Sequence, residues 1–172
     1  MSLLLLRTCL VIFTKVRNYL INLFFNYKQL IMNEIEILNY AQMNFIQNGL
    51  YMVAFTAFVF ITFRLMRFQK EQNANIFGKV LVTIFGLCTV FFGYNVFSFL
   101  YSNQLSQSFR LSELQSTGVE ISSLSQQWID FMGYTVVDGP SIPFGPEPTA
   151  YIFLITLVVM VIAGVWVNLS KN

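Results

Sequence analysis

Two long runs without a charged residue, joined by a short basic segment, constrain the fold more than any other feature of the sequence. The runs extend from Leu50 to Phe63 and from Val80 to Tyr101. With its uncharged flanks, each run supplies the roughly 18 to 20 residues that a helix needs to cross a bilayer. The segment between them holds one acid and several bases: Glu71, Arg64, Arg67, Lys70 and Lys79. The pattern predicts a membrane hairpin with its turn, residues 64–79, on the cytoplasmic or matrix side.

A third charge-free run, from Thr149 to Leu169, predicts a third spanning helix. The composition agrees with membrane residence, because 56% of the residues are hydrophobic and 10% are charged, whereas about 25% are charged in a typical soluble domain. We therefore expect an all-α integral membrane protein with three transmembrane helices, at about residues 45–63, 80–101 and 149–169. A bacterial inner membrane or an organelle inner membrane is the expected location.

The charges outside these spans predict one orientation. Residues 102–148 carry one base and several acids: Arg110, Glu113, Glu120, Asp130, Asp138 and Glu147. If residues 64–79 lie inside, this acidic segment lies outside and Lys171 returns to the inside. Glu34 and Glu36, which precede the first span, then also fall outside, so that separate charge assignments agree on one topology.

The amino-terminal segment, residues 1–31, is basic and has no acid. Its cations interrupt the apolar sequence too often for a simple spanning helix, and a helical projection places most polar side chains on one half. The segment is predicted to be a basic amphipathic helix on a membrane surface. A presequence, a fourth span with paired charges, and translation from Met32 are the alternatives. Because the orientation rule places Glu34 outside, we expect the functional protein to begin near Met32 and to insert without the preceding residues.

Residues 32–172 are expected to form a single membrane domain with an extramembrane loop at 102–148. Within this loop, apolar side chains at helical spacing predict short amphipathic helices, the clearer of which carries Ile121, Leu124, Trp128, Phe131 and Met132 and stops at Gly133. This helix either rests on the outer leaflet, contacts a partner, or folds back onto the spans. A short β-prone patch at Tyr134 precedes a proline-rich connection to the third span.

Small and polar residues inside the spans are the candidates for helix packing. Gly86 and Gly93 lie two helical turns apart on one side of the second span, where they permit close approach of another helix. Asn95 is expected to hydrogen-bond to a neighbouring helix, and Gly164 offers a further packing point in the third span. Side chains at the ends of the helices are expected to anchor the protein at the membrane interface: Arg64, Arg67, Trp128 and Trp166.

The sequence shows no catalytic, cofactor-binding or metal-binding pattern. It contains no histidine, its two cysteines are far apart in sequence, and no phosphate-binding loop is present. No carboxylate or basic side chain lies inside the expected spans, although ion-coupled transport usually depends on one. The only basic cluster flanks the membrane, so nucleic-acid binding has no support.

These features favour a non-enzymatic accessory or assembly subunit of a larger membrane complex. Its partners are then membrane lipids and other proteins, or further copies of the chain. The alternative is a subunit of an oligomeric channel or transporter, whose path would be lined by Thr83, Thr89, Tyr94 and Asn95. A membrane enzyme is the least favoured class, because no base is available to activate the loop serines.

Overall fold

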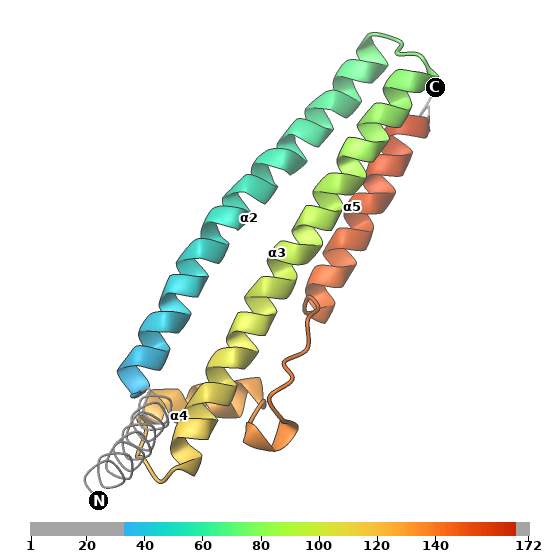
Figure 1. Ribbon diagram of the computed structural model, residues 1–172. Helices are drawn as coiled ribbons and strands as arrows, with labels where there is room; N and C mark the ends of the chain where they lie inside the picture. The colour runs from blue at the N-terminus through green and yellow to red at the C-terminus, as the bar shows by residue number, and fades with distance from the viewer. Residues whose placement is uncertain (1–32, 168–172) are drawn as a thin grey trace, which may run out of the picture.

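The computed structural model describes residues 33–167, which are mostly helical and include no strand. Three long helices run side by side, and a short helix and a 3₁₀ turn lie at one end of the bundle (Figure 1). In chain order the elements are α2 (Glu34–Glu71), α3 (Ile76–Ser116), α4 (Ser123–Met132), η1 (Val136–Asp138) and α5 (Pro148–Trp166). The expected all-helical architecture is confirmed, and α2, α3 and α5 are each long and apolar enough to cross a membrane.

The long helices differ greatly in length. α2 has 38 residues, α3 has 41 and α5 has 19. At a rise of 1.5 Å per residue, they extend about 57, 61 and 28 Å. Only α5 matches the hydrocarbon thickness of roughly 30 Å, so α2 and α3 continue well beyond the section in which all three helices pack together.

The structure corrects several expected boundaries. The basic segment 64–79 is mostly helical, and only residues 72–75 separate α2 from α3. Residues 102–116 continue α3 and are not part of a loop. The expected β-prone patch at Tyr134 leads into the 3₁₀ turn η1, in which the Asp138 side chain accepts hydrogen bonds from the backbone N–H and hydroxyl of Thr135. Residues 1–32 and 168–172, including the predicted amino-terminal helix and the end of the third span, lie outside the described part.

Local signals explain where the helices begin and end. Asn33 and Glu36 form a reciprocal capping box at the start of α2, and the Asn75 side chain accepts the Gly78 N–H at the start of α3. Pro148 opens α5, where its missing N–H costs nothing. Gly133 ends α4 in the left-handed conformation, with φ of 64°, as the sequence predicted.

Aromatic rings from all three long helices meet in the bundle. Phe55 of α2, Phe97 of α3 and Phe153 of α5 pack edge to face, with ring centroids 5.8 to 6.4 Å apart. Phe55 is fully buried in a cluster with Leu154 and Leu157 of α5. This cluster fixes the position of α5 against the hairpin.

The glycines of α3 allow the neighbouring helices to approach closely. A Cβ atom at Gly93 would lie 2.7 Å from Cζ of Phe55, and one at Gly86 would lie 2.6 Å from Cγ1 of Val161. Gly164 of α5 similarly faces Sδ of Met66, at 2.8 Å from an added Cβ. Each of these three glycines therefore lies at a contact between helices of the same chain.

At the opposite end from the 72–75 turn, α4 folds back against α2 and α3. Its Ile129 is buried with Ile37, Leu111 and Leu114, and Trp128 packs partly buried against them. Ser125 and Ile129 of α4 face inward, whereas Leu124 and Phe131 of the predicted apolar stripe are exposed.

A carboxylate at the start of α2 holds the amino terminus of α4. Glu34 accepts hydrogen bonds from the backbone N–H of Ser122, at 3.1 and 3.2 Å, and from the hydroxyls of Ser122 and Ser125. These donors lower the pKa of the Glu34 carboxyl from its ordinary value of 4.5, with the Ser122 hydroxyl having the largest effect and burial acting weakly in the opposite direction. The negative charge also lies at the favourable end of the α4 dipole.

The close contact at Gly93 gives a matched pair of substitutions. Gly93→Ala should destabilise the protein by about 1 to 3 kcal/mol, because the buried Phe55 ring cannot move aside without disturbing its cluster. Gly49→Ala, where an added Cβ meets nothing within 4 Å, should be neutral or stabilising. Thermal unfolding in detergent measures both, and equal melting temperatures would contradict the packing described for Gly93.

The Glu34 contact predicts a pH response confined to one end of the molecule. Because the pKa of Glu34 is lower in the folded state, its stabilisation of α4 is present above about pH 4.5, the unfolded value, and is lost as the pH falls through the folded value. The protection of the α4 amides, taken as their hydrogen-exchange rate relative to the intrinsic rate at each pH, should therefore fall on acidification. In Glu34→Gln this protection should be low already at neutral pH. Glu71→Gln, at the other end of α2, should behave as the wild type, and an identical pH profile for all three proteins would refute the role of Glu34.

Candidate functional site

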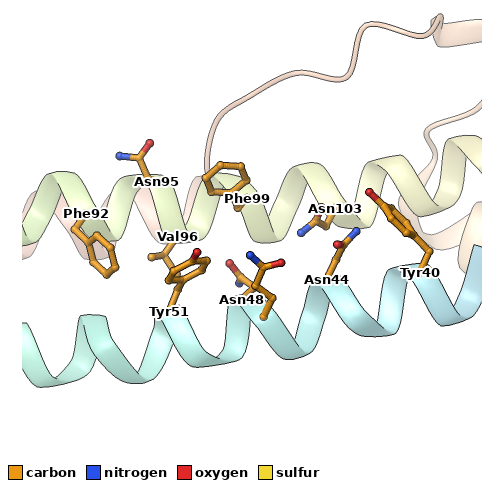
Figure 2. A pocket seen from close by; sticks show the side chains of 10 residues that line it. Tyr40, Asn44, Asn48, Tyr51, Phe92, Asn95, Val96, Phe99 and Asn103 are labelled. Atoms are coloured by element: carbon orange, nitrogen blue, oxygen red, sulfur yellow. The ribbon is translucent and has the colours of Figure 1, made fainter.

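A groove of about 300 Å³ lies between α2 and α3 and is the candidate functional site. Figure 2 shows Asn44, Asn48 and Tyr51 extending from α2 toward α3. Uncharged side chains from both helices line the groove: Tyr40, Asn44, Gln47, Asn48 and Tyr51 of α2, with Phe92, Asn95, Val96, Phe99 and Asn103 of α3. No residue of α5 borders it, so the groove opens along the seam that α5 leaves uncovered.

The groove begins near the end of the three-helix section and runs toward α4. At its inner end Tyr51 and Phe92 pack edge to face, with ring centroids 6.4 Å apart. Tyr51 lies one helical turn from Phe55 along α2, on the side toward α4. From Tyr51 to Tyr40 the groove follows α2 for about 16 Å. At its outer end the guanidinium of Arg110 lies 4.8 Å from the centre of the Tyr40 ring.

Asn48 is the most constrained polar group in the groove. Its side chain is 4% exposed, and its Oδ1 atom is buried without a hydrogen-bond partner among the described residues. Leaving such a group unsatisfied costs about 1 to 3 kcal/mol. Buried polar atoms in native proteins are almost always paired with protein, water or ligand. Among the residues that line the groove, Asn48 Oδ1 is therefore the buried acceptor whose hydrogen bond the described residues do not supply.

The chemistry of the groove is that of binding. Its lining residues contain amides, phenols and aromatic rings but no Asp, Glu, Lys or Arg. Between residues 33 and 167, no group of three or more His, Cys, Asp or Glu side chains is placed to hold a metal ion. The lining therefore offers hydrogen-bond donors, acceptors and apolar surfaces without a charged group to bind an ion or a base to activate a nucleophile.

The polar residues predicted to act within the membrane are occupied by contacts inside the chain. Asn95 borders the groove, and its amide donates a hydrogen bond to the Phe91 carbonyl of its own helix. Thr89 is buried, and its hydroxyl forms a hydrogen bond of 3.2 Å with the hydroxyl of Thr62 on α2. The Tyr94 ring packs against Tyr151 of α5, with centroids 6.2 Å apart.

The predicted interface anchors lie at both ends of the bundle. Arg64 and Arg67 are exposed in the last turns of α2. Trp166 is exposed near the end of α5, and its indole N–H donates to the Thr83 hydroxyl of α3 at 3.1 Å. Trp128 instead packs against the cluster beneath α4, where its indole N–H is buried without an acceptor in the described part of the chain.

Sequence reasoning identified Asn95 but missed Asn48 and the rest of the α2 face. The signal was present, since Tyr40, Asn44, Asn48 and Tyr51 recur every three or four residues and so share one side of a helix. This face does not stand out in the sequence, because polar residues are ordinary just before an apolar span. The matching face of α3 became visible only when the structure paired the two helices beyond the three-helix section.

Comparisons with protein-family models, with curated proteins and with solved structures found no match in any of the three. The function is therefore inferred from the geometry of the chain itself.

Proposed function

We propose that this chain is a non-enzymatic integral membrane protein that serves as an accessory or assembly subunit of a larger membrane complex. One observation carries the proposal. Large apolar side chains are exposed at the α4 end of the bundle, where Leu124 is 72%, Phe131 81% and Val137 95% exposed. Leu124 and Phe131 are two turns apart and share one face of α4. We refer to Leu124 and Phe131 as the α4 patch.

The α4 patch is too far from the bilayer for lipid to cover it. Gln104 of α3 is level with the start of α5, since it lines one recess with Glu147 and Thr149. Leu114, which packs against Ile129 of α4, is ten residues further along α3, which is about 15 Å. Polar headgroups extend only about 5 to 8 Å beyond the hydrocarbon on each side. A protein surface is therefore the occupant that fits the α4 patch.

Charge narrows the chemistry of that partner. Exposed acids accompany the α4 patch along the chain, namely Glu120, Asp130 and Asp138. A partner with an apolar centre and a basic rim complements this surface, because opposite charges guide association while the apolar contact supplies affinity. The role is therefore that of a subunit held through its extramembrane end and anchored by its three long helices.

The proposed orientation places the 72–75 turn on the cytoplasmic or matrix side and α4 on the opposite side. The fold supports this arrangement because α2 and α3 are antiparallel and α5 returns beside them (Figure 1). The basic ends of α2 and α3 therefore share one end of the bundle, and the acidic segment lies at the other. A channel subunit is less well supported, because Thr83, Thr89 and Tyr94 contact other helices of the same chain.

The α4 patch gives the test of the subunit role. After mild detergent extraction, the wild type should migrate on native gels together with one stoichiometric partner protein. The Leu124→Ser, Phe131→Ser double variant should lose that partner and migrate as the isolated chain, because both apolar contacts are removed. Met43→Ser, which changes an equally exposed apolar residue on α2, should keep the partner.

Two results would contradict this role. A ladder of self-multiples in the wild type, with no second protein, would favour the oligomeric channel. In the second, the double variant releases no partner, and deletion of residues 2–31 makes the α4 patch accessible to a hydrophobic dye. This result would show that the chain's own amino-terminal segment covers the α4 patch.

The orientation is tested by labelling single cysteines in a Cys9→Ser, Cys88→Ser background. Glu120→Cys and Gln72→Cys both change exposed positions, which lie at opposite ends of the bundle. In intact cells or mitoplasts, a membrane-impermeant maleimide should label Glu120→Cys, and should label Gln72→Cys only after permeabilisation. The reverse pattern would invert the topology.

A further inference from the structure

The hydrogen-bonding groups of Asn48 limit which ligands fit the groove between α2 and α3. The buried amide offers both an acceptor and a donor, and its Oδ1 atom has no partner among the described residues. A group that can donate and accept at the same point satisfies such an amide, and a hydroxyl is the simplest. Asn44 and Asn103 line the same groove and provide further amides for neighbouring hydroxyls.

The absence of charged side chains from the lining further limits the chemical class of the ligand. A phosphate beside Asn48 would leave water without a cation to pair with it, because the Arg110 guanidinium lies over Tyr40 at the outer end of the groove, about 12 Å along α2 from Asn48. An ammonium group would lack a carboxylate. Either ion would lose most of its hydration energy without compensation. The group held in the groove is therefore uncharged. The volume of about 300 Å³ is at the small end of ligand pockets and suits a single ring or a short polyol.

A row of rings continues from the groove into the apolar section of the seam. Tyr51 packs against Phe92, which in turn packs against Phe58 with ring centroids 5.5 Å apart. Phe58 then packs against Phe85, with centroids 6.4 Å apart. Phe58 is partly exposed along this row. The seam thus joins a polar recess, just beyond the three-helix section, to an apolar track running inward along the same two helices. This sequence of surfaces matches a lipid, with its headgroup in the groove and an acyl chain on the rings.

We propose that the α2–α3 groove binds the uncharged, hydroxyl-bearing headgroup of a lipid, a sugar or glycerol headgroup, with Asn48 as its central contact. The proposal depends on the membrane insertion proposed above but not on the subunit role. The Asn48 amide hydrogen-bonds to the hydroxyls, Tyr51 and Phe92 close the inner end, and the row of rings orients the acyl chain.

The test uses the full chain in nanodiscs of phosphatidylcholine containing a minor fraction of a glucosyl diacylglycerol. Incorporation into the discs reports membrane insertion separately from headgroup binding. Lipids retained by the protein after gentle extraction are counted by native mass spectrometry. The wild type should enrich the glycolipid over its fraction in the disc. Asn48→Leu should reduce this enrichment roughly tenfold, the effect of losing a buried hydrogen-bonded contact.

Matched variants separate binding from folding. Asn48→Leu keeps the branching of asparagine at Cγ and leaves no polar atom unpaired, so it should fold, and its melting temperature in detergent checks this. Asn44→Leu, in the same groove, should weaken retention in the same direction. Asn39→Leu makes the same change on the exposed surface of α2 outside the groove and should retain the glycolipid as the wild type does.

Several outcomes would overturn the proposal. Equal retention in the wild type and Asn48→Leu, or no enrichment in inserted wild type, would leave water as the only occupant. Complete displacement of the glycolipid by free glucose would assign the groove to a soluble saccharide. Preferential retention of phosphatidylglycerol from mixed discs would refute the requirement for an uncharged headgroup. None of these results bears on the partner at the α4 patch, whose gel assay is independent.

Discussion

The unequal lengths of the long helices govern the organisation of this molecule. α5 extends about 28 Å, whereas α2 and α3 extend about twice as far. The apolar section shared by the three helices therefore ends where α5 begins, and the remaining halves of α2 and α3 stand as an antiparallel pair. The seam of this pair lacks the third helix that covers it further along the bundle, so it stays open on one side. The groove around Asn48 and the docking of α4 are two consequences of this change from three helices to two.

Close packing inside the shared section decides which side of the pair stays open. α5 lies against α3 through Gly86 and Gly93, and its Phe153 joins Phe55 and Phe97 in one cluster of rings. With α5 held on that side, Tyr51, Phe58 and Phe92 form the opposite side of the seam. The glycines that the sequence offered as packing points thus act within the chain. Surfaces for partners and lipids are found elsewhere, on the α4 patch and along the open seam.

The candidate site was predictable only in part, for a physical reason that its residues illustrate. Asn95 stood out because it interrupts an apolar run, yet in the structure it bonds to its own helix. Asn48 did not stand out, because it lies among other polar residues where a polar side chain is ordinary. Its importance comes from burial, and burial depends on which residues of α3 face it. Similarly, the apolar stripe of α4 left open whether it faces lipid, a partner or the spans. In the structure Ser122 and Ser125 bond to Glu34 and Ile129 packs on the bundle, so Leu124 and Phe131 face outward.

The sequence by itself determined the helical class, the three apolar helices, the clustering of bases at one end and acids at the other, and the stop at Gly133. These properties follow from composition, from local capping and from the length of uncharged runs, all of which act over a few turns of one helix. Only the tertiary structure decided that α2 and α3 continue far past the shared apolar section, that Glu34 holds α4, and that Asn48 is buried without a partner. These features depend on contacts between residues as far apart as Glu34 and Ser125, whose pairing is fixed by helix packing and not by any local sequence signal.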